Sequence, residues 1–221
     1  MSHDLETYWN RYGEGVKDEE PAEPLTFGWT QYDAHGPGEE LLEQPDRTLE
    51  LGFGRGRNVA YLARKGVRAT GVDISGVQCE RARERYGHVP GARFEQGEVC
   101  QYLTAAADDD EERFDAIYSV WGALWFTDPE RLLPLVRQCL APRGVLAFSN
   151  APAVPGSYGV QGMYGAGFKG RRLWIYRWAY TPEDWTEILQ RHGFVDVDAR
   201  VLEAPDPENV GTLIVQARAP H

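Results

Sequence analysis

A glycine-rich turn carries the clearest chemical signal in this sequence. The segment Glu50-Leu-Gly-Phe-Gly-Arg-Gly-Arg-Asn58 follows a short apolar run and precedes a helical pattern. A glycine turn between a strand and a helix lets the backbone approach a ligand closely, and the helix N-terminus adds hydrogen-bond donors. The spacing acid-x-Gly-x-Gly-x-Gly puts Glu50 at the strand end. Its carboxylate can there hold a cationic or hydrogen-bond-donating group of a ligand.

This turn does not fit the fingerprint of dinucleotide-binding oxidoreductases, which is GxGxxG. Counted from Gly52, the third glycine position holds Arg57, and counted from Gly54 it holds Val59. Both alignments fail, so a nicotinamide dinucleotide is not the expected ligand.

A second carboxylate follows the turn at a distance that suits a nucleoside site. Asp73 comes at the end of the next strand pattern, seventeen residues after Gly56. A carboxylate at that place can accept hydrogen bonds from both hydroxyls of a ribose. Either acid alone could be an ordinary strand-end or helix-cap residue. Glu50 and Asp73 placed around one glycine turn together indicate a nucleoside ligand.

Alternating strand and helix patterns surround these residues. Strands are expected at residues 47–51, 68–73, 92–96, 114–120, 144–148, 195–202 and 212–217, and helices at 58–65, 75–86, 128–140 and 181–192. This alternation predicts an α/β fold, a mostly parallel sheet with helices on both faces. The last two strands have no helical pattern between them and should pair antiparallel. Because Pro134 interrupts its pattern, the third helix begins either at Pro129 or only at Pro134.

Two segments without a clean period accompany this pattern. Residues 1–46 are rich in turn signals and also in aromatic residues, so we expect an irregular cap that folds onto the main domain, residues 47–221. Residues 150–180 are rich in glycine and aromatic residues and are expected to form a lid inserted into that domain. In such folds ligands bind beyond the carboxyl ends of the strands, where both segments can cover them.

Composition restricts the partners. The 221 residues suit one globular domain, and 34 acidic against 23 basic residues give a formal net charge of −11. Such a field repels nucleic acid and anionic membrane surfaces. No apolar run is long enough to cross a bilayer, the first residues lack a signal-peptide pattern, and three scattered cysteines predict neither disulfides nor a metal site. We therefore expect a cytoplasmic protein, a monomer or a homodimer, that binds neither nucleic acid nor membranes.

Four stretches resemble the class I S-adenosylmethionine-dependent methyltransferases. They are Leu49–Asn58, Gly71–Ser75, Phe114–Ser119 and Leu140–Phe148, within a resemblance that extends from Thr48 to Ala217. The resemblance implies a Rossmann-like seven-stranded sheet whose last strand is antiparallel, with S-adenosyl-L-methionine as the cofactor. The glycine turn departs from the commonest form of that family at Phe53 and Arg55.

The same resemblance implies a role for the residues at the strand ends. The three glycines of the turn face the methionine part of the cofactor, and Asp73 binds the ribose. Ile74 flanks the adenine, Glu98 meets its amino group, and Ser119 borders the methionine amine. With two aromatic residues of the cap, the expected cofactor-binding set is Tyr12, Trp29, Glu50, Gly52, Gly54, Gly56, Asp73, Ile74, Glu98, Val99 and Ser119.

Methyl transfer requires that the acceptor and the methyl carbon be aligned in a site from which water is excluded. Aromatic side chains suit that task, and the residues expected to contact the acceptor are Tyr8, His35, Trp121 and Tyr164. No general base is identified. No Asn-Pro-Pro-Tyr stretch follows the 114–120 strand, which argues against the amino-methyltransferases that act on nucleic acid or protein amides.

The expected function is methyl transfer to an oxygen or nitrogen of a small molecule, in specialised metabolism. One alternative is an aminopropyl-type transferase of the same fold. It needs paired acids along an amine channel, and none follows the 114–120 strand. Another alternative is a non-catalytic protein that binds S-adenosylmethionine as a sensor or partner subunit, and it would keep Glu50 and Asp73 as well.

Overall fold

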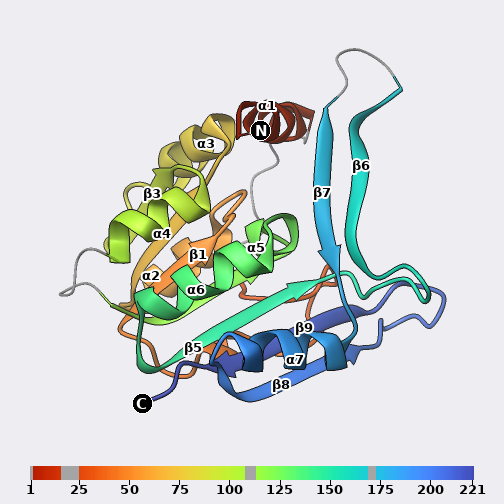
Figure 1. The fold of residues 1–221 in the computed structure, drawn as a ribbon. Helices are drawn as coiled ribbons and strands as arrows, with labels where there is room; N and C mark the ends of the chain where they lie inside the picture. Colours follow the sequence, from red (N-terminus) through yellow and green to blue (C-terminus); the bar gives the residue numbers. More distant parts are fainter. Residues whose placement is uncertain (1, 16–24, 108–112, 169–172) are drawn as a thin grey trace.

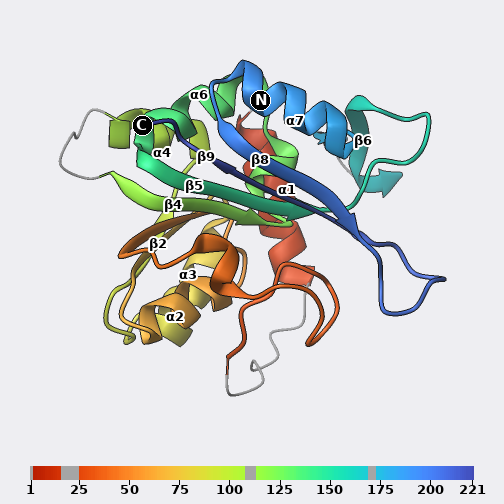
Figure 2. The ribbon, with the colours of Figure 1, turned by 90° about the horizontal axis from the view of Figure 1, so that it is seen from below.

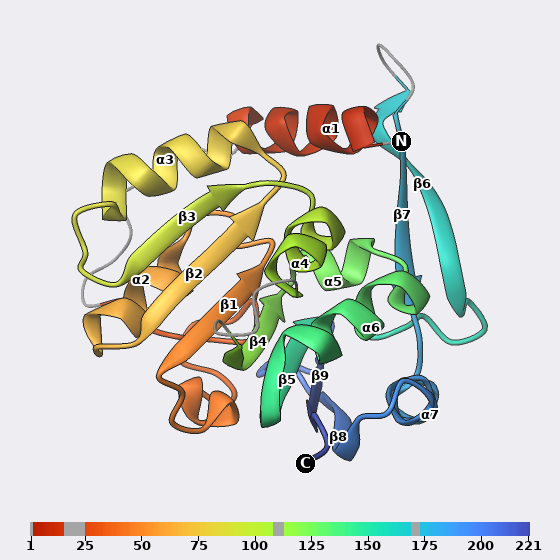
Figure 3. The same ribbon diagram turned by 60° about the vertical axis from the view of Figure 1, so that its left-hand side comes forward.

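Seven strands form the central sheet: β1 (Arg47–Leu51), β2 (Arg68–Asp73), β3 (Ala92–Gln96), β4 (Phe114–Val120), β5 (Leu140–Asn150), β8 (Val195–Leu202) and β9 (Thr212–Arg218). The computed structural model describes residues 2–15, 25–107, 113–168 and 173–221. The strand order is β3-β2-β1-β4-β5-β9-β8 (Figures 1 and 3). Strands β1 to β5 pair in parallel, whereas β9 is antiparallel to both of its neighbours. The predicted fold class and its antiparallel last strand are confirmed.

Helices cover both faces of this sheet. They are α1 (Ser2–Gly15), α2 (Arg57–Arg64), α3 (Gly76–Tyr86), α4 (Val99–Ala107), α5 (Ala123–Phe126), α6 (Pro129–Cys139) and α7 (Pro182–Arg191), with a short 3-10 helix η1 (Glu39–Leu42). Figure 2 shows α4, α6 and α7 on one side of the sheet and α2 and α3 on the other. Each side has its own apolar cluster of buried side chains. The inner parallel strands β1, β2 and β4 are therefore mostly buried, whereas the edge strand β3 buries only Phe94.

Helix caps follow the local sequence. The Ser75 hydroxyl accepts a hydrogen bond from the Gln78 amide at 3.3 Å, and Thr181 forms a reciprocal capping box with Asp184. The helix α6 begins at Pro129 and continues through Pro134, so the interruption expected at Pro134 does not occur. Four of the helix's side chains are buried with Pro129 in the core, which offsets the one backbone hydrogen bond that an internal proline removes.

The expectation of an irregular N-terminal cap is wrong for its first part. Residues 2–15 form α1, which lies across the molecule between α3 and the ribbon of β6 (Gly159–Phe168) and β7 (Trp174–Ala179) (Figure 3). The Asn10 side-chain oxygen accepts hydrogen bonds from the Ser75 hydroxyl at 2.8 Å and the Val77 amide at 3.4 Å. Arg81 donates to the Gly13 carbonyl at 2.6 Å. These bonds fasten α1 to the first turns of α3.

The second part of the cap, residues 25–38, is called the strap here. Its Leu25, Phe27 and Trp29 are buried against the face of the sheet that α2 and α3 cover. Residues 16–24, between α1 and the strap, lie outside the described part of the chain.

The insertion at 150–180 forms a two-stranded antiparallel ribbon of β6 and β7 that projects from the sheet (Figure 1). Ile175 and Ala179 of β7 are buried, whereas Trp174 and Tyr176 on the opposite face are 51% and 46% exposed. Residues 169–172 at the end of the ribbon lie outside the described residues. No helix among the described residues is both long and apolar enough to cross a membrane.

Substituting Asn10→Ala should loosen α1 without unfolding the domain. It removes the acceptor of the Ser75 and Val77 hydrogen bonds, at a cost of about 1 kcal/mol. We expect faster hydrogen–deuterium exchange in residues 2–15 and an unchanged rate in the sheet. Asn209→Ala, in an exposed loop, is the matched control. Unchanged exchange in α1 of the Asn10 variant would contradict this docking.

Candidate functional site

The glycine turn joins β1 to α2 and has two kinds of glycine. Gly52, Gly54 and Gly56 all have positive φ, at 78°, 52° and 73°. A Cβ on Gly52 would lie 2.4 Å from the Ala123 nitrogen, and one on Gly56 would lie 2.6 Å from the Phe94 ring. A Cβ on Gly54 would meet no atom within 4 Å. Packing therefore requires glycine at Gly52 and Gly56, whereas Gly54 leaves its space open.

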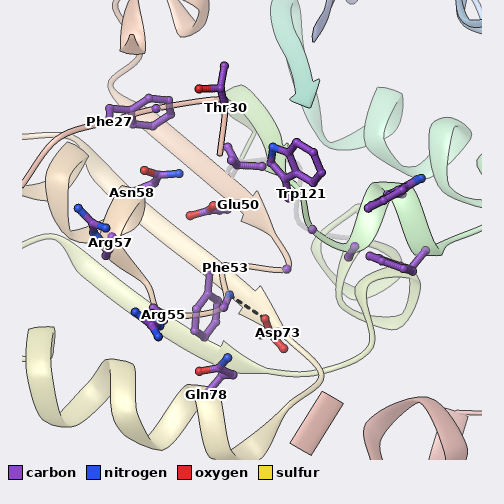
Figure 4. Close-up of a pocket in the computed structure, with 18 of the residues that line it drawn as sticks. Phe27, Thr30, Glu50, Phe53, Arg55, Arg57, Asn58, Asp73, Gln78 and Trp121 are labelled. Carbon is purple, nitrogen blue, oxygen red and sulfur yellow. Dashed lines mark hydrogen bonds between the residues drawn. The ribbon is translucent and has the colours of Figure 1, made fainter. Parts of the chain in front are cut away.

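A buried carboxylate ties this turn to the end of β2. The Gly54 amide donates to one Asp73 carboxylate oxygen at 2.9 Å (Figure 4), and the Ser75 amide donates to the other at 2.9 Å. Burial raises the pKa of Asp73, and these two hydrogen bonds oppose that rise. Each carboxylate oxygen keeps a second acceptor site, so Asp73 can still bind two hydroxyl groups.

Glu50 is the second buried carboxyl of the site and is 2% exposed. The Tyr118 hydroxyl donates to it at 3.2 Å, and the Asn58 side chain forms a further hydrogen bond with it. Loss of water around this carboxyl raises its pKa to about 8. A bound cation strongly stabilises the ionised form of such a buried carboxyl, because the charge of the cation replaces the missing solvation.

A cavity of about 720 Å³ opens over both carboxyls. Its floor is the glycine turn and the ends of β1, β2 and β3, and its walls come from α1, the strap and α5. In Figure 4, Glu50 lies near the middle of the site, with Arg57 on one side and Trp121 on the other. Pockets of roughly 300–1,000 Å³ hold a drug-sized ligand, so this cavity has room for a nucleoside and a small second molecule.

Most of the residues predicted from the sequence line this cavity. They are Tyr8, Tyr12, His35, Glu50, Gly52, Gly54, Asp73, Ile74, Glu98, Val99 and Trp121. Their direct contact with a ligand stays a prediction. Glu98 already caps α4, because its carboxylate accepts hydrogen bonds from the amides of Cys100 and Gln101, both at 3.1 Å.

Two predicted residues lie beneath the cavity and do not line it. Trp29 is fully buried, and its indole donates to the Gly38 carbonyl at 2.8 Å. Ser119 is 1% exposed, and its hydroxyl donates to the Leu51 carbonyl at 2.7 Å. Both residues support the walls: the Trp29 carbonyl accepts a hydrogen bond from the Trp121 indole at 3.0 Å, and Ser119 accepts one from the Leu124 amide at 3.3 Å.

Gly56 and Tyr164 are also absent from the cavity lining. Gly56 precedes α2 and lies against Phe94, so its lack of a side chain serves packing. Tyr164 is on β6, where it is 41% exposed and its ring lies 4.4 Å from that of Trp174. The described residues of the 150–180 ribbon contribute nothing to the lining. One of them, Arg177, packs instead on the outer side of the wall, 5.5 Å over the Trp125 ring.

Sequence reasoning missed several lining residues. Leu5 and Trp9 of α1 line the cavity beside Tyr8 and Tyr12, and these four positions have the i, i+3, i+4, i+7 spacing of one helix face. That spacing was a usable signal. Arg57, Asn58 and Gln78 also line the cavity. Their contribution depends on how α2 and α3 are placed, which no local pattern shows.

Trp121 is held in an unusual backbone conformation. Its φ is 51°, which is rare for a residue with a large side chain. Its backbone amide donates to the Ser149 carbonyl at 2.8 Å while its indole is bound to Trp29. Strain of this kind, of order 1–3 kcal/mol, persists only where the surrounding structure fixes it, and it is concentrated at functional sites.

Comparisons with known proteins agree with this geometry. Residues 49–148 match a family model described as a methyltransferase domain. Over 118 residues the chain is 33% identical to trans-aconitate 2-methyltransferase of Paracidovorax citrulli, a match that covers 50% of this chain and 43% of that protein. It is 26% identical over 151 residues to a ubiquinone biosynthesis O-methyltransferase of Pasteurella multocida, covering 65% of this chain and 59% of the relative. The chain thus matches less than two thirds of either relative's length.

Among solved structures, the chain resembles the 1,6-didemethyltoxoflavin-N1-methyltransferase of Burkholderia thailandensis, with bound S-adenosylhomocysteine. The TM-score is 0.60 and the identity 24%, over 83% of this chain and 75% of that one. This likeness shows that the two proteins share a fold. The residues that match the methyltransferase-domain model extend from β1 to β5 and include the glycine turn and Asp73.

The described part of the chain lacks a cluster of side chains that could bind a metal ion together. No group of three or more His, Cys, Asp or Glu residues there could hold a metal ion. Cys79, Cys100 and Cys139 are free and buried, and burial raises the pKa of each thiol to about 11 or 12. All three thiols are therefore neutral near pH 7.

Two alanine substitutions should separate ligand binding from packing. Gly54→Ala adds a Cβ in open space at positive φ, so we expect only about 1–2 kcal/mol of lost stability but at least a tenfold loss of S-adenosylhomocysteine affinity. Gly56→Ala drives a Cβ into Phe94 and should lower stability by more than the Gly54 variant. Urea unfolding and calorimetric titration measure both quantities. The reverse order of stability losses would refute these assignments.

Glu50→Gln should change how stability depends on pH. The folded protein keeps a proton on Glu50 up to about pH 8, whereas the unfolded chain loses it near 4.5, so the folded state binds more protons in between. Wild-type stability relative to the variant is therefore highest below about pH 4.5, falls by roughly 2–4 kcal/mol as the pH rises from 4.5 to 8, and levels off above that. Urea unfolding of both proteins from pH 5 to 8.5 measures this difference. Parallel stability curves would show that the pKa of Glu50 is not raised in the folded protein.

Proposed function

We propose that this protein transfers a methyl group from S-adenosylmethionine to an oxygen or nitrogen atom of a small molecule. The observation that supports it most strongly is the pair of buried carboxyls, Glu50 and Asp73, on either side of Gly54, which has free space where a Cβ would lie. The methyltransferase domain match and the fold of the solved relatives agree with it.

The residues at the strand ends fit this cofactor. Asp73 retains acceptor sites for the two ribose hydroxyls while its bonds to Gly54 and Ser75 hold it in place. Ile74 and Val99 offer apolar surface for the adenine. Glu50 faces the cavity as the group that would hold the methionine amine, and that ammonium would favour its ionised form.

When bound, S-adenosylmethionine supplies a methyl group on a positively charged sulfur. A lone pair of the acceptor atom forms the new bond to the methyl carbon as the carbon–sulfur bond breaks, and that electron pair stays on sulfur. The acceptor proton then passes to solvent. The chain's own part is to orient the acceptor and exclude water, and the aromatic residues of α1 and α5 over the cavity suit that part.

The relatives' names support a small acceptor. They specify trans-aconitate, an O-methylation in ubiquinone biosynthesis and N1 of 1,6-didemethyltoxoflavin. A role in specialised metabolism extends this proposal. An aminopropyl-type transferase is less well supported, because it needs paired acids along an amine channel. Among the described residues of α1, the strap and α5 that line the cavity, Asp33 is the single acidic residue.

Asp73→Asn should weaken the binding of S-adenosylmethionine and S-adenosylhomocysteine by about 1–3 kcal/mol, through lost ribose hydrogen bonds. Asp115→Asn is the matched control, since Asp115 also accepts two backbone hydrogen bonds, from Asp46 and Arg47 at 2.9 Å, but lies outside the cavity. Calorimetric titration of the folded variants gives the comparison. Equal affinity in the wild type and the Asp73 variant would remove the cofactor assignment.

Catalysis needs a separate measurement, because a sensor protein would bind the same nucleoside. Incubation with S-adenosylmethionine and a library of small acceptors, followed by mass spectrometry, should show S-adenosylhomocysteine together with an acceptor heavier by one methyl group. Tight nucleoside binding without turnover on any acceptor would favour the non-catalytic alternative.

A further inference from the structure

A row of aromatic rings forms the wall of the cavity above the cofactor floor. Ring centroids are 4.8 Å apart for Trp9 and Phe126, 5.0 Å for Phe126 and Trp125, and 5.8 Å for Trp125 and Trp121. All four residues line the cavity, and all are only partly buried. The row joins α1 to the end of β4, and neighbouring rings in it are inclined to one another at 73°, 48° and 86°.

The rings of this row differ in burial from the aromatic residues of the core. Trp29, Tyr118 and Trp185 are each fully buried and have protein on all sides. The rings of the row keep accessible surface that faces the cavity, so a ligand can remove it from water. Apolar surface covered in this way contributes to binding, and ring–ring contacts add a preference for an aromatic partner.

Two polar atoms in the cavity wall also remain without a partner. His35 Nδ1 and Trp125 Nε1 are buried and have no hydrogen-bond partner among the described residues. The backbone around His35 is nevertheless fixed, because the Thr30 hydroxyl donates to the His35 carbonyl at 3.0 Å and Tyr32 packs edge-on against the imidazole. Protein atoms cover both nitrogens in this structure, whereas the His35 and Trp125 side chains themselves line the cavity, so a ligand's polar group can approach their rings there.

We propose that the methyl acceptor is a planar aromatic compound that lies against the Trp9–Trp121 row and directs a hydroxyl or ring nitrogen to His35. This proposal rests on the proposed methyltransferase function and specifies its acceptor class. An aromatic acceptor can meet these inclined rings face to edge, which is a preferred geometry of aromatic pairs. Arg55 and Arg57 belong to the cofactor side, and Figure 4 places Arg57 across the site from Trp121. The acceptor side therefore has no arginine, among its described lining residues, for an aliphatic carboxylate.

The first test compares two ligands of the same skeleton on unmodified protein saturated with S-adenosylhomocysteine. 1-Naphthol and decahydro-1-naphthol share the hydroxyl and the carbon frame and differ in aromaticity. Calorimetric titration should show about tenfold or more tighter binding of 1-naphthol, the size expected from one or two ring contacts. Equal binding of the two, or tighter binding of decahydro-1-naphthol or of an aliphatic tricarboxylate, overturns the proposal. If S-adenosylhomocysteine itself does not bind, the proposed function fails instead.

Variants then locate the preference. Trp125→Leu should reduce the advantage of 1-naphthol over its saturated analogue to less than threefold, and Phe126→Leu provides a second test should the first variant not fold. Trp174→Leu, a tryptophan 51% exposed on β7 and outside the cavity, is the matched control and should keep the full advantage. An undiminished advantage in a folded wall variant contradicts the assigned surface.

His35 is tested by a ligand cycle. The wild type should bind 1-naphthol more tightly than naphthalene, and His35→Leu should abolish that difference while leaving naphthalene binding within twofold. Thermal unfolding confirms that the variant is folded. An unchanged 1-naphthol preference in His35→Leu would show that the acceptor's polar group does not meet this imidazole.

Discussion

The hydrogen bond from the Gly54 amide to Asp73 is the constraint on which the site depends. It is 2.9 Å long and joins the turn after β1 to the end of β2. The turn can approach Asp73 only because Gly52, Gly54 and Gly56 adopt positive φ, and two of them could not carry a side chain against their neighbours. Sheet pairing of β1 with β2 fixes the distance that this bond spans. The carboxylate is thus oriented before any ligand arrives, which lowers the entropic cost of binding.

The site also concentrates features that oppose stability. Glu50 and Asp73 are carboxyls with raised pKa values in a desolvated setting, and Trp121 has a strained backbone. Two apolar clusters, one on each face of the sheet, supply the opposing stability. Trp29 and Ser119 connect the stable core to the strained site, because they are core residues whose hydrogen bonds fix the wall and floor of the cavity. Buried residues outside the cavity therefore determine its shape.

The sequence was sufficient for the sheet and for placing Glu50 and Asp73 in one cavity, whereas ligand contact by the predicted residues stays a prediction. Strand–helix alternation reports parallel topology directly, and Glu50 and Asp73 lie at strand ends that must meet at one edge of the sheet. It was insufficient where tertiary packing decides. The sequence around an aromatic residue does not show whether its side chain faces a cavity or the core. Trp29 and Tyr164 were both expected at the site, but Trp29 lies in the core and Tyr164 on the ribbon. The face of α1 was detectable from the spacing of Leu5, Tyr8, Trp9 and Tyr12, although the turn signals that follow obscured it.

A crystal structure with S-adenosylhomocysteine tests the central claim most directly. We expect the ribose hydroxyls within hydrogen-bonding distance of Asp73, the amino-acid tail over the turn between Gly52 and Gly56, and the sulfur directed toward the aromatic wall. A cavity without nucleoside at saturating ligand, or one that holds a nicotinamide dinucleotide in its place, would contradict the assignment.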